Sequence, residues 1–383
     1  MNDTVSLEAH RSEMAAYVRD GEARAHLLGN RGPIRYDPDG SVSGDIMEAY
    51  WKHGFYVFEG LVDPEEIALL KQDFQRLIDG APVGDGATED RLGRPAIGQE
   101  FARNPYILIK PLSDPWGGTE LLGGRHPHRM TEPQPADEAP DKVVFLISGM
   151  CQLSEPGLRL YGHPDILAIA EAINGEDFVP YNDATFVKQP GLGGSVAWHQ
   201  DGVTHWDNPA WDEGIHGFNF QVQLYECTPY NCLWVLPGTH KLGKVDIKAR
   251  IAANGGSEYL PDAVPLMCKP GDVTIANRQV LHCSFANTSP QQRVSVTFGF
   301  HRYSSVLGAS GALSQTSSEV YDEARIDERA GIIQLAIDAR SQFYPAEHPF
   351  SYRRFVGRED EFRYTDETRT GILKDYNLKD LSI

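Results

Sequence analysis

The feature that most constrains the fold is a dense series of short strand patterns between residues 178 and 301. Apolar and polar residues alternate along residues 217–227, where Phe218, Phe220 and Val222 share one face and amide side chains share the other. Further strands are predicted at residues 178–188, 196–201, 233–236, 273–276, 280–285 and 293–301. Pro-Gly and Asn-centred turns separate these segments. Short strands with turns between them predict an antiparallel sandwich or barrel.

Helical patterns flank this β region on both sides. Residues 63–66 (Asp-Pro-Glu-Glu) open a helix, because a capping Asp, a Pro in the first turn and acids near the positive helix end all favour initiation. Further helices are predicted at residues 6–28, 163–174 and 318–343. We therefore expect three parts: an N-terminal extension (1–45), a β domain with helical support (46–305), and a C-terminal helical extension and tail (306–383).

Charge and cysteine content exclude several classes of protein. A formal net charge of −19 argues against a nucleic-acid groove or an anionic membrane surface, because both need a basic surface. No segment approaches the roughly 18 to 20 continuous apolar residues that span a bilayer, and the charged N-terminus lacks the apolar core of a secretory signal. The five cysteines contain no C-x-x-C pair, which fits a reducing compartment. We expect a cytoplasmic protein that binds neither nucleic acid nor membrane.

His-x-Asp, a spacing that can hold a metal ion, occurs three times. On a strand, residues i and i+2 point to the same face, so one His and one carboxylate can bind one ion without strain. Only His199 and Asp201 follow a plausible strand, at residues 196–198. The pair at 163 and 165 lies at a helix start, where Pro and Asp serve initiation, and the pair at 205 and 207 lies in a loop rich in Trp, Asn and Pro. We therefore predict His199 and Asp201 as metal ligands.

A third ligand and an anion-binding residue follow later in the chain. His282 lies on the predicted strand 280–285, and two His with one carboxylate form the ligand set of non-haem Fe(II) oxygenases. The competing interpretation of a single His in a strand is a buried core residue. Arg293 begins the next strand, and a guanidinium that faces a barrel interior is costly unless it meets an anion. Its planar fork suits a carboxylate, with a surface salt bridge as the alternative.

Further motifs accompany these residues: Val235-Leu236-Pro237-Gly238-Thr239-His240-Lys241, Gly271-Asp272, Cys283-Ser284 and Asn287-Thr288-Ser289. Together with the predicted ligands and Arg293, this set resembles the phytanoyl-CoA dioxygenase family over roughly residues 46–303. The resemblance implies a mainly β fold with flanking helices, built on a double-stranded β-helix (jelly-roll or cupin-like) core.

The resemblance also implies roles for individual residues. By this resemblance, His199, Asp201 and His282 bind iron(II), and Arg293 binds the C5 carboxylate of 2-oxoglutarate. Ser284, which lies two residues after His282, is expected to help hold that carboxylate.

The substrate and the other end of the co-substrate involve further candidates. Asn182, on the strand before the His-x-Asp strand, is a candidate for the other end of 2-oxoglutarate. His205 and Trp206 lie in the loop 202–217, which suits an apolar or ring-bearing substrate, with a self-packed loop as the alternative. Lys188 matches a Lys-x-Pro segment of the family and is expected near the substrate, with a solvent-facing role as the alternative.

The predicted function is an Fe(II)- and 2-oxoglutarate-dependent dioxygenase that uses O2, hydroxylates a small molecule and releases succinate and CO2. Relatives that halogenate lack the carboxylate ligand, so Asp201 favours hydroxylation or desaturation. No basic cluster for the phosphates of coenzyme A is evident, so a free small molecule is expected as substrate. The alternative is a cupin-like metal-binding protein, an isomerase or hydrolase, that does not use 2-oxoglutarate and would not need Arg293 in its interior.

Overall fold

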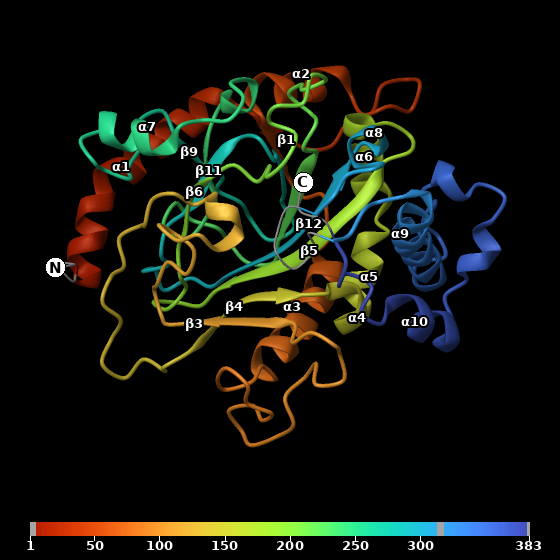
Figure 1. Cartoon of the computed structure of the whole chain (residues 1–383), viewed down its shortest axis with the longest axis horizontal. Coiled ribbons are helices and arrows are strands. Elements are labelled where there is room, and N and C mark those ends of the chain that lie inside the picture. The colour runs from red at the N-terminus through yellow and green to blue at the C-terminus, as the bar shows by residue number, and fades with distance from the viewer. Residues whose placement is uncertain (1–4, 312–317, 381–383) are drawn as a thin grey trace.

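Two β-sheets lie at the centre of the computed structural model, which describes residues 5–311 and 318–380 (Figure 1). The larger sheet has the strand order β1-β2-β10-β7-β12-β5-β4-β3, and the smaller sheet has the order β6-β11-β8-β9. The strands of the larger sheet are β1 (Arg31–Gly32), β2 (Phe55–Phe58), β3 (Tyr106–Ile109), β4 (Val143–Ser148), β5 (Val179–Lys188), β7 (Phe218–Gln223), β10 (Val273–Asn277) and β12 (Arg293–His301). Those of the smaller sheet are β6 (Val196–His199), β8 (Trp234–Leu236), β9 (Val264–Pro265) and β11 (Leu281–Ser284).

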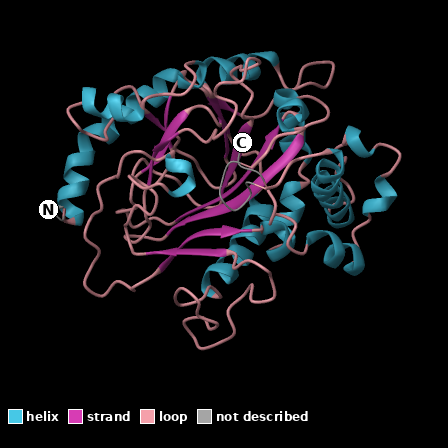
Figure 2. Cartoon of the chain, in the orientation of Figure 1, coloured by secondary structure: helices cyan, strands magenta, loops and turns pink. Residues whose placement is uncertain are grey.

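Strand pairing is antiparallel between neighbours of both sheets, except that β1 runs parallel to β2. Within the described residues the two sheets do not join into a closed barrel. The prediction of a β core with flanking helices is confirmed (Figure 2).

The larger sheet has one apolar face and one polar face. Phe218, Phe220 and Val222 of β7 belong to a core packed against helices, together with the alternate apolar residues of β12. Between them stand polar residues such as Asn219 and Gln221, which line a cavity on the opposite face. Period-two alternation therefore separates the stabilising core from the surface that faces the smaller sheet.

Helices supply the apolar partner of that core. Tight contacts join α5 to α9, and α9 also contacts β5 and α10 (Figure 1). On the opposite side, α1 packs on β9, and Tyr17 stacks on Trp234 with ring centroids 4.4 Å apart. The helices are α1 (Leu7–Leu28), α2 (Gly44–His53), α3 (Pro64–Asp79), α4 (Met150–Leu153), α5 (Glu155–Tyr161), α6 (Pro164–Asn174), α7 (Ile247–Ala253), α8 (Tyr303–Val306), α9 (Glu323–Phe343) and α10 (Asp366–Leu373).

Most predicted elements appear with small boundary shifts. The helix predicted at 318–343 begins at Glu323, where Asp322 accepts a hydrogen bond from the Arg325 amide as its cap. Strand β4 was missed, because its continuous apolar run lacks the alternation of a half-buried strand. Among the described residues, no helix is long and apolar enough to cross a lipid bilayer.

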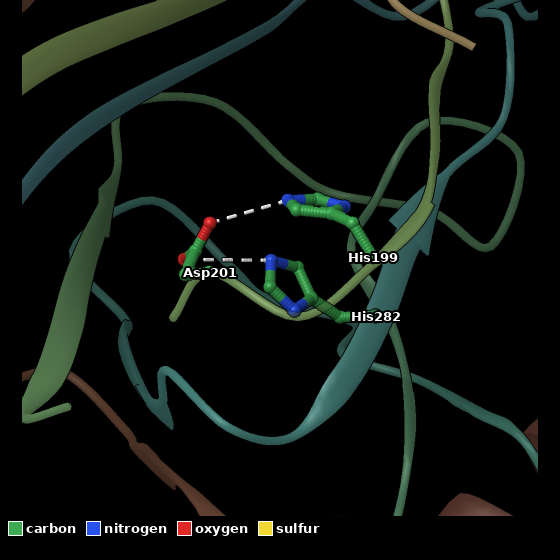
Figure 3. A group of neighbouring side chains, drawn as sticks. All are labelled: His199, Asp201 and His282. Atoms are coloured by element: carbon green, nitrogen blue, oxygen red, sulfur yellow. Dashed lines mark ion pairs between the residues drawn. The ribbon is translucent and has the colours of Figure 1, made fainter. Parts of the chain in front are cut away.

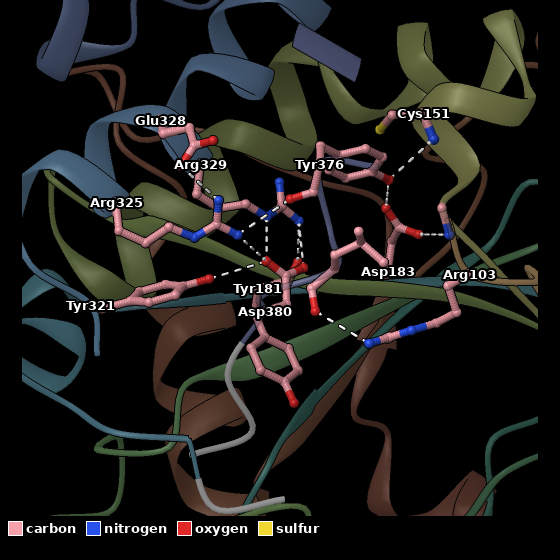
Figure 4. Close-up of polar contacts among 12 residues, drawn as sticks. Arg103, Cys151, Tyr181, Asp183, Tyr321, Arg325, Glu328, Arg329, Tyr376 and Asp380 are labelled. Carbon is pink, nitrogen blue, oxygen red and sulfur yellow. Dashed lines mark hydrogen bonds and ion pairs between the residues drawn. The ribbon is translucent and has the colours of Figure 1, made fainter. Parts of the chain in front are cut away.

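Buried polar contacts attach the described C-terminal residues to α9 and to the larger sheet (Figure 4). The Asp380 carboxylate pairs with the fully buried Arg329, with Nε–Oδ1 and Nη2–Oδ2 distances of 2.8 and 3.2 Å. Tyr321 donates its hydroxyl to the same carboxylate at 3.1 Å. Nearby, the Tyr376 hydroxyl donates to the buried Asp183. These contacts tie the tail to α9 and β5.

We predict that Asp380→Ala lowers the free energy of unfolding by about 3–5 kcal/mol, because it removes the carboxylate that pairs with the buried Arg329 guanidinium and leaves that charge with neutral partners only. Chemical denaturation measures the change. Glu361→Ala, which removes one half of the exposed Arg358–Glu361 pair, is the matched control and should have a much smaller effect. Equal effects of the two substitutions would contradict this view of the tail.

Candidate metal centre and cavity

Strand pairing in the smaller sheet brings the three predicted ligands together. His199 on β6 and His282 on β11 are direct cross-strand partners. Asp201 follows the end of β6, and its carboxylate oxygens lie 3.3 Å from His199 Nε2 and 3.7 Å from His282 Nε2 (Figure 3). One ligand atom from each residue lies within 4.8 Å of the others, and all three residues are buried. The cluster therefore presents two imidazole nitrogens and a carboxylate to one point.

Backbone contacts orient both imidazoles in the same way. His199 Nδ1 lies 2.8 Å from the Ala197 carbonyl oxygen, and His282 Nδ1 lies 2.9 Å from the Val280 carbonyl oxygen. A neutral ring that donates from Nδ1 keeps its lone pair on Nε2, the atom that faces Asp201. Burial, with His199 adding to it, lowers the pKa of His282 to about 4. The donor set thus fits a divalent metal ion.

Neighbouring side chains hold the Asp201 ligand in place. Asn219 of β7 donates its amide to Asp201 Oδ2 at 2.7 Å, across the gap between the two sheets. The Asp201 backbone carbonyl accepts from Arg125 Nη1 at 3.0 Å and from Arg278 Nη2 at 3.3 Å. Burial alone would raise the pKa of the Asp201 carboxyl, but His282, His199 and Arg125 hold that pKa well below its ordinary value. The carboxylate is therefore kept ionised and fixed in orientation.

A cavity of ≈ 370 Å³ opens between the sheets beside the three ligands. Arg293 lines it from β12 and is 2% exposed. Its guanidinium donates to Ser295 Oγ, the Asn231 carbonyl and Gln221 Oε1 at 2.7, 3.1 and 3.1 Å. No carboxylate forms an ion pair with Arg293 within the part of the chain that the structure describes. A buried guanidinium whose observed partners are all neutral is suited to bind an anion.

Two other predicted co-substrate residues line the same cavity. Ser284 is buried at the end of β11, and Asn182 is exposed on β5. The structure therefore brings Ser284, Asn182 and Arg293 to one cavity with the three ligands. Their roles toward a co-substrate stay predictions.

The structure places the three predicted substrate residues outside this cavity. Lys188 is buried and donates to the carbonyls of Gly194 and Phe285, so the solvent-facing alternative is wrong. Burial, then the nearby Arg293, lowers the pKa of Lys188 well below its ordinary value. β5 turns Lys188 toward backbone acceptors between the sheets, which explains why it does not reach the cavity.

Side chains of the loop 202–217 make contacts both within the loop and with neighbouring elements. His205 Nε2 lies 3.0 Å from the Ser305 carbonyl, and Trp206 donates to the Gly202 carbonyl at 3.0 Å. The His216 ring packs on Trp206 at a centroid distance of 4.4 Å. Trp206 lines a neighbouring cavity of ≈ 480 Å³ instead.

The His-x-Asp pair at the start of α6, His163 and Asp165, has a structural role. His163 occupies the N-cap position before Pro164, and Asp165 accepts a hydrogen bond from Tyr36 at 2.5 Å. The helix-start interpretation is in accord with this geometry.

Several residues around the centre were missed in the sequence. Arg125 and His126 come from the Gly- and Pro-rich region between β3 and β4, which has no periodic pattern. His126 is buried, and its ring centroid lies 4.2 Å from that of His199. Asn219 could have been predicted from the sequence, because it lies on the polar face of a strand with clear alternation. Arg278 carried a weaker signal, since it precedes the His282 strand.

Comparison with known proteins places the chain in a family. The phytanoyl-CoA dioxygenase (PhyH) family model matches residues 50–295. "Phytanoyl-CoA dioxygenase domain-containing protein 1" of Danio rerio is 31% identical over 275 residues, which are 66% of this chain and 87% of that protein. "Phytanoyl-CoA dioxygenase 1" of Oryza sativa subsp. japonica is 34% identical over 113 residues, 28% of this chain and 38% of the rice protein. The chain belongs to the phytanoyl-CoA dioxygenase family, which confirms the predicted resemblance.

The match to the rice protein spans little more than a third of that protein's length. Among solved structures, EctD from S. alaskensis with 2-oxoglutarate and 5-hydroxyectoine is 18% identical, with a TM-score of 0.49. That comparison covers 71% of this chain and 80% of EctD.

We predict that Asn219→Ala weakens metal binding by about ten- to a hundred-fold, because the substitution removes the hydrogen bond that orients Asp201. Titration with Co(II), followed by its absorption, measures the affinity. Asn182→Ala removes the same amide group from the same cavity wall and serves as the control. If both variants bind Co(II) as the wild type does, Asn219 does not support the ligand.

Proposed function

We propose that this chain is an Fe(II)- and 2-oxoglutarate-dependent oxygenase that oxidises a small molecule. The observation that carries the proposal is the combination, in one cavity, of a buried two-His, one-carboxylate cluster with Arg293, a buried cation that pairs with no carboxylate among the described residues. Family membership supports the same activity. The two sheets that enclose this cavity are in accord with a double-stranded β-helix core.

His199, Asp201 and His282 are the proposed iron ligands. Two His and one carboxylate leave coordination positions open, as non-haem oxygenases require. Iron, 2-oxoglutarate and O2 together supply the oxidising chemistry, with release of succinate and CO2. The protein contributes binding, orientation and the exclusion of water from a buried site.

Arg293 is the proposed anchor of the C5 carboxylate of 2-oxoglutarate. Its contacts with Ser295, Asn231 and Gln221 fix the plane of the guanidinium before the anion binds. Preorganised donors bind an anion more tightly, because less conformational freedom is lost on binding. Ser284, at the end of the ligand strand β11, is proposed to donate to the same carboxylate.

Hydroxylation is the proposed outcome. Asp201 occupies the position that a halide would need in a halogenating relative, and Asn219 and two arginines hold it there. A cupin-like isomerase or hydrolase would need the three ligands but would have no use for a buried Arg293. The interior position of Arg293 therefore favours the 2-oxoglutarate-dependent enzyme.

His282→Ala should abolish Fe(II)-dependent formation of succinate from 2-oxoglutarate in the presence of a substrate, because two ligands hold the metal less well than three. The assay quantifies succinate for the wild type and the variant over the same metal concentrations. His348→Ala, a substitution of an exposed histidine, is the control and should keep wild-type turnover. Equal succinate formation by the His282 variant would end the proposal.

Arg293→Gln should raise the KM for 2-oxoglutarate by about ten- to a hundred-fold, since a hydrogen bond to a charged group contributes about 1.5–3 kcal/mol. Arg19→Gln, on the exposed face of α1, is the matched control. An unchanged dependence on 2-oxoglutarate in the Arg293 variant would favour the cupin-like alternative.

A further inference from the structure

The charged side chains that line the cavity are mostly positive, although the chain as a whole is strongly negative. In a chain with a net charge of −19, those among the described residues are Arg103, Arg125, Arg278 and Arg293, and the one acid is Asp201. These arginines are far apart in the sequence and come from different segments. The cavity is therefore a cationic pocket inside an acidic protein, which concentrates anions near the proposed metal centre.

Arg125 and Arg278 flank the metal ligand Asp201. Arg125 Nη1 lies 3.0 Å from the Asp201 carbonyl and 3.5 Å from Asp201 Oδ1, and its side chain is 18% exposed. Arg278 is 1% exposed, and its guanidinium lies over the Tyr181 ring at 4.2 Å. Both guanidiniums therefore stand beside the position where a substrate must meet the metal.

Both arginines also keep a donor unused. The Nε atoms of Arg125 and Arg278 are buried and have no hydrogen-bond partner within the described chain. Arg278 already uses its Nη atoms on the carbonyls of His216 and Asp201 and on the His301 ring. Arg125 makes fewer contacts, and a guanidinium carries five N–H donors, so it is the more available of the two.

Charge balance points to a further anion. In the proposed complex, Arg293 pairs with the C5 carboxylate of 2-oxoglutarate, and Asp201 and the second carboxylate together balance the two charges of iron(II). Arg125 and Arg278 are then left without a negative partner among the described residues that line the cavity, which leaves an excess of positive charge next to the reaction site. Guanidiniums stay protonated in proteins, so this excess cannot be relieved by loss of a proton.

We propose that Arg125, supported by the positive charge of Arg278, binds an anionic group of the substrate. The substrate is then a small organic acid with a carboxylate or a phosphate. This inference rests on the proposed function and names its substrate class. Because Arg125 contacts Asp201, the carbon that is oxidised lies within a few bonds of the anionic group.

The surroundings of Arg125 leave room for the rest of such a molecule. Arg125 borders both the ≈ 370 Å³ cavity and the neighbouring ≈ 480 Å³ cavity, which Trp206, Lys244, Asp246 and Lys248 also line. Arg103 lines the first cavity as well, and it donates to the Leu378 carbonyl of the tail at 3.2 Å. Other cations therefore line both of the cavities that Arg125 borders.

The test compares acids with uncharged analogues. Zn(II)-loaded protein, with and without 2-oxoglutarate, is titrated by calorimetry with three probe series: linear and aromatic carboxylic acids, the alkyl and aryl phosphates of matching size, and the primary amides of the same acids. The proteins are the wild type, Arg125→Gln, Arg125→Lys, and Arg129→Gln. Arg129 lies four residues further along the same segment, with a side chain that is 50% exposed, and is the matched control.

At least one acid or phosphate should bind the wild type at least about tenfold more tightly than the uncharged amide of matching size. The reason is that the anion accepts charge-assisted hydrogen bonds from Arg125. Arg129→Gln should keep this preference, Arg125→Gln should lose most of it, and Arg125→Lys should keep part of it because the charge remains. The series that shows the preference distinguishes a carboxylate from a phosphate substrate.

Two results would overturn the inference. The first is that acids and phosphates bind the wild type no better than amides, which includes the case in which no probe binds. The second is that Arg125→Gln keeps the preference but loses affinity for 2-oxoglutarate, because Arg125 would then belong to the co-substrate site. Failure of the wild type to bind 2-oxoglutarate would instead count against the proposed function, and the titrations without 2-oxoglutarate would still test the arginine site.

Discussion

The site depends on one backbone interaction, the antiparallel pairing of β6 with β11. This pairing sets His282 directly opposite His199, although 83 residues separate them in the sequence. A shift of one residue in this strand register would turn one imidazole to the other face of the sheet, so that the three ligands would no longer meet. The carbonyls of Ala197 and Val280 then fix the ring orientation, so register and tautomer are both determined by backbone atoms.

The larger sheet supplies the remaining polar side chains of the site. Its apolar face is buried by helices, which frees the opposite face to carry polar groups toward the cavity. Asn219 from β7 orients the carboxylate ligand, and Arg293 from β12 brings a cation to the same cavity. Alternation along two adjacent strands thus couples the stability of the core to the chemistry of the site.

Local patterns in the sequence were enough to predict most strands of this core and the pair His199 and Asp201, because both follow from the period of a strand, whereas the continuous apolar run of β4 shows no such period. His282 and Arg293 required the spacing of a known family as well. The convergence of Arg125 and Arg278 on Asp201 had no such signal, since one lies in an irregular segment and both contacts depend on tertiary structure. The same limit explains Trp206, which packs within its own loop and lines a neighbouring cavity.

The central claim is that the three ligands and the cation of the cavity form one site for iron(II) and 2-oxoglutarate. An anaerobic titration of the Fe(II)-loaded protein with 2-oxoglutarate tests this claim most directly, because chelation of the metal by the keto acid produces a visible metal-to-ligand absorption band. The account predicts that the band appears and saturates at one 2-oxoglutarate per chain. A protein that binds Fe(II) but develops no band at any concentration of 2-oxoglutarate would contradict it.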